Sequence, residues 1–145
     1  MTNINNNLSF ESFKEANKPN FFGDIEYIYT ILKIKQLPLD FLFKIVSLVF
    51  PSFLELDGCL FLANEFDQKK YENLKETTED NIQFWMNLIE FTSLHEDLSE
   101  EVALLLASKI ADSWNAKIKY EGIMAKGKAR AFKDEEYGEV FLTID

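Results

Sequence analysis

The sequence has few of the residues on which catalytic and metal sites most often depend. Its 145 residues include one cysteine, one histidine and one arginine. A single cysteine, Cys59, can form neither an internal disulfide nor a cysteine-pair zinc site, which favours a reducing compartment and a buried, unreactive side chain. With one histidine, His95, a serine or cysteine nucleophile would have one possible base, and no serine stands in a nucleophile-elbow sequence. A hydrolase built on such a pair is therefore not expected.

Long apolar runs are also missing. The longest apolar window, residues 41–50, is interrupted by Lys44 and Ser47 and ends at Pro51. It is shorter than the roughly 18 to 20 residues of a membrane span. Residues 1–7 contain no Lys, no Arg and no apolar run, so we expect no secretory signal there. These absences predict a cytoplasmic protein.

What the sequence does contain is typical of one folded domain. A domain of this length buries roughly 70% of the surface of its unfolded chain. Apolar residues make up 47% of the sequence and include 14 phenylalanines, which is enough for a core. Because no internal repeat and no linker rich in glycine, serine and proline divides the chain, we expect a single domain over residues 1–145, with residues 1–8 flexible.

Apolar residues recur at spacings of three and four behind capping residues, which is typical of amphipathic helices. Helices are predicted over residues 9–17, 24–36, 38–48, 77–92 and from Ser99 through Ile118, and one or two exposed helical turns over 67–76. The expected caps are Ser9, Asp24, Thr77 or Thr78, and Ser99. The segment 38–48 is apolar on nearly all sides, so we expect a central helix that is buried on most sides, with a buried strand as the alternative. The predicted inward face of the last helix consists of Val102, Leu105, Leu106, Ile110, Trp114 and Ile118.

Two segments instead show the period of two that indicates strands. Asp57 and Gly58 stand between the apolar runs 53–56 and 59–62, and this dipeptide is a strong hairpin signal. A second hairpin is predicted near the C-terminus, with its turn at Tyr137 and Gly138. The expected fold class is α+β: a small antiparallel sheet built from two β-hairpins, packed with four to five helices.

The negative charge is concentrated in one stretch. The formal net charge is -10, and residues 55–101 hold 13 Asp or Glu against 3 Lys, while the other 98 residues hold 12 of each sign. Such a surface repels nucleic acid and membrane lipid and attracts basic partners over a Debye length of about 8 Å. We therefore expect a basic protein partner and no nucleic acid or membrane. The candidate contact residues are Asp67, Glu72, Glu76, Glu79, Asp80, Glu90, Glu96 and Asp97.

No catalytic or metal-binding motif stands out from the sequence. His95 lies in an expected exposed loop without convergent ligands, and Gly127, between two lysines, is not part of a glycine-rich loop before a helix. Acidic neighbours such as Glu76 and Asp80 do not form a calcium-binding loop. A carboxylate pair that acts as acid and base stays open, because the fold sets its separation. We expect no catalysis, no cofactor and no metal.

The two tryptophans, Trp85 and Trp114, fall on predicted inward faces, so we expect both in the core. The positions of Phe61, Phe66 and Phe84 stay open. An aromatic side chain left exposed beside the acidic stretch would be a natural anchor for an interface.

The order of features over residues 50–145 resembles small bacterial proteins of toxin and immunity loci. The features are Phe50-Pro51, Glu55 in the hairpin with Asp57-Gly58, the helix with Trp85, the alanine-rich helix that reaches Trp114, and the terminal hairpin. This resemblance implies an immunity protein, a small acidic cytosolic inhibitor that neutralises a cognate toxin. It carries over no functional residue.

The sequence thus predicts a non-enzymatic inhibitor whose carboxylates occlude the active or substrate-binding surface of a basic toxin, such as a nuclease. Two alternatives stay open. One is a small-molecule enzyme with a carboxylate pair in a cleft between sheet and helices. The other is a phage-type inhibitor of a nucleic-acid-binding machine, which would use the same acidic surface.

Overall fold

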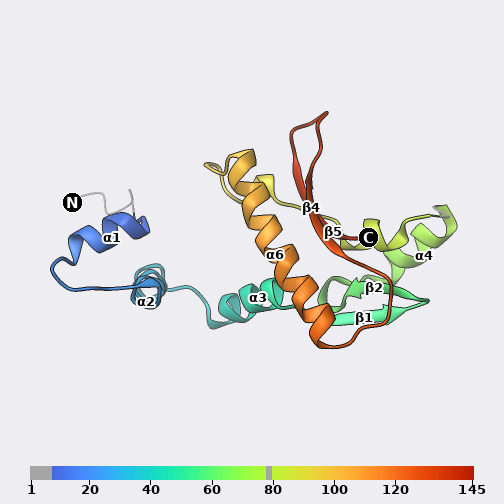
Figure 1. Ribbon diagram of the computed structural model, residues 1–145, viewed down its shortest axis with the longest axis horizontal. Helices are drawn as coiled ribbons and strands as arrows, with labels where there is room; N and C mark the ends of the chain where they lie inside the picture. Colours follow the sequence, from blue (N-terminus) through green and yellow to red (C-terminus); the bar gives the residue numbers. More distant parts are fainter. Residues whose placement is uncertain (1–7, 78–79) are drawn as a thin grey trace. The chain divides into compact units, whose positions relative to one another are not determined.

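The computed structural model describes residues 8–77 and 80–145 and shows an α+β protein (Figure 1). Where the sequence predicts one domain, the chain divides into two compact units, Met1–Phe43 and Lys44–Asp145. Over the described residues, no helix is both long and apolar enough to cross a membrane.

The first unit contains α1 (Phe10–Ala16), α2 (Asp24–Lys35) and the start of α3 (Leu39–Val49). Ser9 caps α1 as predicted, because its hydroxyl accepts a hydrogen bond from the Ser12 N–H at 3.2 Å. The cap of α2 is Gly23 and not the expected Asp24. The Tyr27 ring packs against two phenylalanines of α1, and its hydroxyl donates to the carbonyl of Leu8.

The second unit contains two antiparallel sheets. One is the hairpin of β1 (Phe53–Leu56) and β2 (Cys59–Leu62), and the other has the order β3-β5-β4, with β3 (Ile89–Glu90), β4 (Ala129–Lys133) and β5 (Val140–Ile144). Both predicted hairpins therefore form. They lie in separate sheets rather than one: β5 pairs with β3 and β4, whereas β1 and β2 pair only with each other.

The predicted helix over 77–92 is interrupted. After α4 (Gln68–Thr77), α5 covers only Ile82–Asn87, and the chain then becomes extended as β3, followed by a short 3₁₀ helix, Thr92–Leu94. Asn87 explains the end of α5. Its buried amide accepts from the Leu62 N–H at 2.9 Å and donates to the Leu60 carbonyl at 2.8 Å, so it hydrogen-bonds to β2. Residues 89–90 are then free to pair with β5.

The longest helix, α6 (Glu100–Tyr120), begins as predicted, with Ser99 accepting from the Val102 N–H at 3.3 Å, and it packs on β4 and β5 (Figure 1). Its inward face differs from the prediction. Val102, Leu105 and Leu106 are 47%, 57% and 43% exposed, whereas the buried residues are Ala103, Ala107, Ala111, Trp114 and Lys117.

Close packing explains this rotation of α6. The side-chain amide of Asn115 donates to the Ala129 carbonyl and accepts from the Ala129 N–H, both at 2.8 Å, which ties the helix directly to the backbone of β4. Small alanine side chains permit so short a separation, whereas leucines at the same positions would force the helix away. Val102, Leu105 and Leu106 therefore face outward, while Leu104 packs against the core.

The apolar helix α3 contains no buried residue, contrary to the expectation that it lies at the centre of the core. Its last turn is held by α6, because Trp114 Nε1 donates to the Leu48 carbonyl at 2.7 Å and Ser113 Oγ donates to the Val49 carbonyl at 2.6 Å. Leu48 also packs against the main core. The apolar sequence of α3 therefore led to an overestimate of how much of this helix is buried.

Candidate functional site

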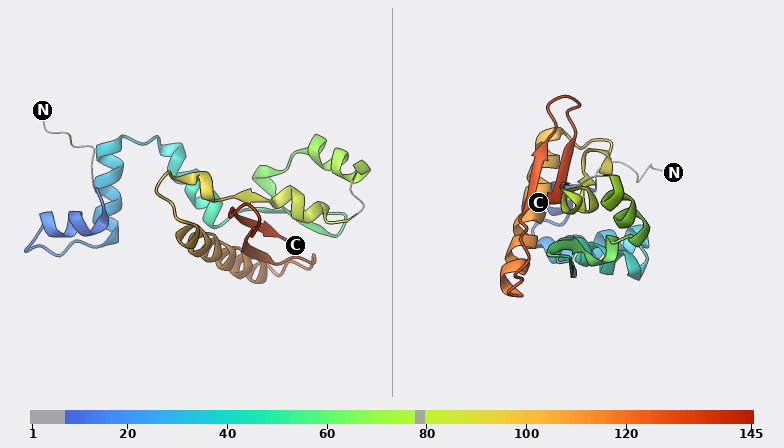
Figure 2. Two further views of the ribbon diagram at one scale, coloured as in Figure 1. Left: turned by 90° about the horizontal axis from the view of Figure 1, so that it is seen from above. Right: turned by 90° about the vertical axis from the view of Figure 1, so that its right-hand side faces the viewer.

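The structure separates the predicted contact residues into two groups on the second unit. Asp67, Glu72, Glu76 and Asp80 lie on or next to α4, whereas Glu96 and Asp97 lie in the loop before α6. Figure 1 and the left view of Figure 2 show α4 and the start of α6 well separated. Glu79 lies outside the described residues.

Glu90, the remaining candidate, is engaged locally. It is half-buried on β3, and its carboxylate accepts from the Ser93 N–H at 3.0 Å. Hydrogen bonds from Ser93 and then Thr92 lower the pKa of Glu90. Its carboxylate stabilises the turn after β3 and is not freely available to a partner.

The first group, which we call the α4 group, is interspersed with lysines. Residues 67–80 hold five carboxylates, those of the α4 group and Glu79, and three lysines. Lys75 contacts the Asp57 carboxylate at 3.0 Å, and Lys70 donates to the Trp85 carbonyl at 3.1 Å. The Glu72 carboxylate accepts from Gln68 at 2.9 Å. The lysines reduce the net negative charge of this part of the chain.

A small network links α4 to the turn of the first hairpin. The Tyr71 hydroxyl donates to Asp57 Oδ2 at 2.5 Å, and this bond is the main reason that the pKa of Asp57 is lowered and the pKa of Tyr71 is raised. The Asp57 carboxylate also raises the pKa of Lys75. Asp57 has a positive φ of 53° in the turn, a conformation that aspartate tolerates. The network is a structural clamp between hairpin and helix.

The second group is larger than the sequence predicted, because the turn between β4 and β5 lies beside the start of α6 (Figure 1). The Lys133 ammonium contacts the Glu100 carboxylate at 2.6 Å, and this contact raises the pKa of Lys133. Residues 96–101 and 133–139 together hold eight carboxylates and this one lysine. We call these residues the acidic end. Its carboxylates belong to Glu96, Asp97, Glu100, Glu101, Asp134, Glu135, Glu136 and Glu139.

The acidic end is held in place at several points. The Phe91 N–H donates to the Val140 carbonyl, and the Val140 N–H donates to the Thr92 hydroxyl, both at 2.8 Å, so the start of the segment before α6 is bonded to β5. Asp134 organises the β4–β5 turn, because its carboxylate accepts from the N–H groups of Glu136 and Tyr137. The carboxylates therefore stand on an ordered backbone.

Exposed apolar side chains accompany this acidic end. Tyr137, in the turn between β4 and β5, is 70% exposed. Leu94, two residues before Glu96 in the sequence, is 61% exposed. Val102 and Leu106 lie one turn apart on the outward side of α6. These side chains lie on or next to the segments of the acidic end, and apolar side chains bordered by charged ones are common in protein–protein interfaces.

The other chemical candidates give no catalytic geometry. His95 is exposed, and its Nδ1 accepts from the Asp97 N–H at 3.1 Å, while Cys59 is half-buried in β2. Among the described residues, no group of three or more His, Cys, Asp or Glu side chains could hold a metal ion. Trp114 is buried as predicted, but Trp85 is 46% exposed, because the short α5 turns Met86 and Asn87 inward instead.

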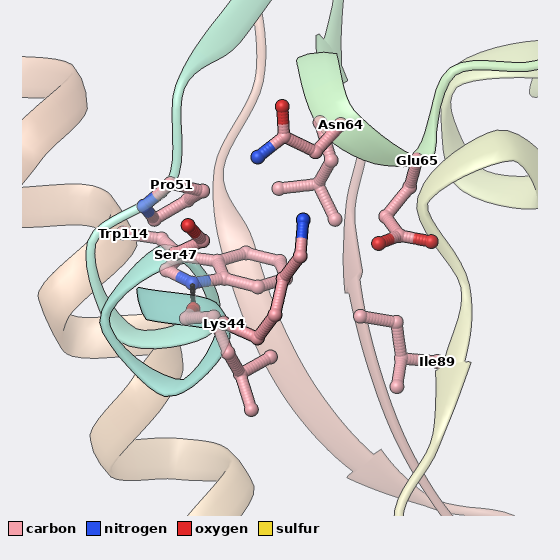
Figure 3. A pocket seen from close by; sticks show the side chains of 9 residues that line it. Lys44, Ser47, Pro51, Asn64, Glu65, Ile89 and Trp114 are labelled. Carbon is pink, nitrogen blue, oxygen red and sulfur yellow. Dashed lines mark hydrogen bonds between the residues drawn. The ribbon is translucent and has the colours of Figure 1, made fainter. Parts of the chain in front are cut away.

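A pocket of about 220 Å³ lies in the second unit, where α3, the 3₁₀ helix Ala63–Glu65 and β3 supply lining residues beside Trp114 (Figure 3). Glu65 is the one carboxylate among its lining residues. The lining therefore does not supply the pair of carboxylates that the enzyme alternative requires.

Comparison with protein-family models, with curated proteins and with solved structures finds no match for this chain. The resemblance to immunity proteins therefore stays a prediction from the sequence.

Proposed function

We propose that this protein is an inhibitor that binds a basic partner protein through its acidic end, and that it acts in the cytoplasm as an immunity protein against a toxin. The observation that carries the proposal is the excess of negative charge at the acidic end. Two separate segments contribute eight carboxylates and one lysine, Lys133, which pairs with Glu100.

Such a surface suits a partner that itself binds phosphates. Carboxylates can replace the phosphates of a nucleic acid at lysine and arginine side chains, and complementary charge accelerates association. Exposed Tyr137 and Leu94 supply apolar contact area that charge alone would not. The inhibitor covers the partner's substrate surface and performs no chemistry, and its own charge keeps it from binding nucleic acid.

The test uses two variants with the same change in net charge. One reverses Glu96, Glu101 and Glu135 to lysine at the acidic end. The matched control reverses Glu72, Glu76 and Asp80 to lysine around α4. Both sets are exposed, so each variant should fold.

Wild-type and variant proteins are used to capture partners from the source cell, and the recovered partner's activity is assayed with and without the inhibitor. We expect a protein with a basic surface that is retained by wild type and control, is lost by the acidic-end variant, and is inhibited on binding. A recovered partner that is a nucleic-acid-binding host machine rather than a toxin would favour the phage-type alternative. A partner without a basic surface, or one retained by both variants, would refute the proposal.

A further inference from the structure

The pocket over Trp114 presents opposite charges that do not pair with each other. Lys44 reaches it from α3, and Asn64 and Glu65 reach it from the 3₁₀ helix Ala63–Glu65 (Figure 3). Within the described part of the chain, these three side chains have no hydrogen bond or ion pair. These three side chains are exposed, so an ammonium, an amide and a carboxylate line one hollow without a protein partner among the described residues and can bond to a ligand.

Apart from Ser47, the rest of the lining is apolar and consists of Leu48, Leu62, Ile89, Pro51 and Trp114. The Trp114 ring is fully buried and its N–H is already bonded to the Leu48 carbonyl, so half-buried Leu48 and Ile89 supply the apolar surface that a ligand can reach. A few placed polar groups above an apolar base are the usual composition of a small-molecule site.

The geometry points to a small zwitterion, a free α-amino acid with an apolar side chain, as the ligand of this pocket. Its carboxylate would bind Lys44, its ammonium would bind Glu65, and its side chain would lie on Leu48 and Ile89, above the buried Trp114 ring. A volume of about 220 Å³ corresponds to about seven water molecules at about 30 Å³ each, which suits a molecule of this size.

Other ligand classes satisfy fewer of these groups. A simple anion would leave the Glu65 carboxylate facing it, and a simple cation would meet Lys44. A partner's side chain carries at most one of the two charges. A zwitterion satisfies both at once, and the Asn64 amide can bond to either end of it. This site shares no residue with the acidic end and does not depend on the proposed function.

The test uses Trp114 as the reporter. The chain has two tryptophans, so a Trp85→Phe variant leaves Trp114 as the single indole. Fluorescence and calorimetry are then recorded with leucine, methionine and phenylalanine as probes. Two analogues of leucine are added: isocaproate, which lacks the amine, and isoamylamine, which lacks the carboxylate.

We expect a saturable signal with at least one of the three amino acids. For leucine as the responding probe, each analogue should bind about tenfold more weakly or worse, because it loses a charge-assisted contact. The pattern should change in a specific way in two variants. Lys44→Met should remove the advantage of leucine over isoamylamine, and Glu65→Gln should remove its advantage over isocaproate. If methionine or phenylalanine responds instead, its own deaminated and decarboxylated analogues replace these two.

Lys69→Met and Glu72→Gln, on α4 and outside the pocket lining, serve as matched controls and should bind like the parent. Absence of heat and fluorescence change with all three amino acids would overturn the inference. So would equal binding of the amino acid and its two analogues, or an unchanged preference in both pocket variants.

Discussion

The α4 group and the acidic end both carry several carboxylates within a short stretch of chain, but they differ in what lies beside those carboxylates. In residues 67–80, three lysines are interspersed with five acidic residues, and Lys75 forms an ion pair with Asp57. At the acidic end, folding adds four more carboxylates from the β4–β5 turn and only Lys133. Charge density along the sequence is therefore a poor guide to charge density on the surface.

The two regions are also anchored differently. The acidic end depends on α6, whose C-terminal half is fixed by the buried Trp114. The α4 group lies over a smaller core of Phe61, Tyr71 and Met86, and Asn87 ties α5 to the first hairpin there. Substitutions at these anchors test the comparison most strongly.

Trp114→Ala should have the largest effect. Removing this fully buried ring leaves a cavity and frees the Leu48 carbonyl, so the free energy of unfolding should fall by about 3–5 kcal/mol. Urea denaturation followed by circular dichroism measures the loss. The half-exposed Trp85→Ala is the matched control and should lose far less. Equal losses in the two variants would show that α6 is not fastened through Trp114.

Asn87→Ala should have the second-largest effect on stability. Its amide bonds to the N–H of Leu62 and to the carbonyls of Leu60 and Gln83, and these groups would lose their partner in the interior. We expect a loss of about 1–3 kcal/mol in the free energy of unfolding. Asn73→Ala, on the exposed side of α4, is the control and should be nearly neutral. A small loss at Asn87 would contradict its role as the link between α5 and β2.

These anchors also explain how far the sequence could predict the fold. The Asp57-Gly58 turn and the Ser99 cap are local signals, and the first hairpin and the start of α6 followed from them as expected. The outward turn of Leu105 could not be predicted, because it depends on how closely α6 approaches β4. Nor could the end of α5, since the partners of Asn87 lie more than twenty residues earlier in the chain.

The candidate site shows the same limit. Glu96 and Asp97 were predicted from the acidic stretch, whereas Asp134, Glu135 and Glu136 lie outside that stretch. These three consecutive acidic residues were visible in the sequence as part of a hairpin turn. What the sequence could not show is that the turn lies beside Glu100, because that depends on the packing of α6 against β4.

The smallest expected effect is the pH dependence of the stability that the Tyr71–Asp57 hydrogen bond near α4 contributes. The raised pKa of Tyr71 means that its contribution to stability is complete below the ordinary tyrosine value of about 10 and is lost as the pH rises through the folded value. The lowered pKa of Asp57 means that its contribution is present above about pH 4 and is lost as the pH falls through the folded value.

The stability difference between wild type and Tyr71→Phe should therefore be greatest near neutral pH and should shrink at both extremes. Denaturation curves at roughly pH 3, 7 and 11 measure it, around the ordinary values for the two groups. A difference that stays the same at all three would mean that the Tyr71–Asp57 bond does not contribute to stability.

The most direct test of the acidic end is a nuclear magnetic resonance titration of the ¹⁵N-labelled wild-type protein with a lysine decapeptide as a basic probe. The account predicts that the largest amide shifts occur in residues 94–101 and 134–139, and that they shrink as salt is added, since screening shortens the reach of the charges. Shifts centred on residues 67–77, or spread evenly over both regions, would contradict the claim that the acidic end is the surface that attracts a basic partner.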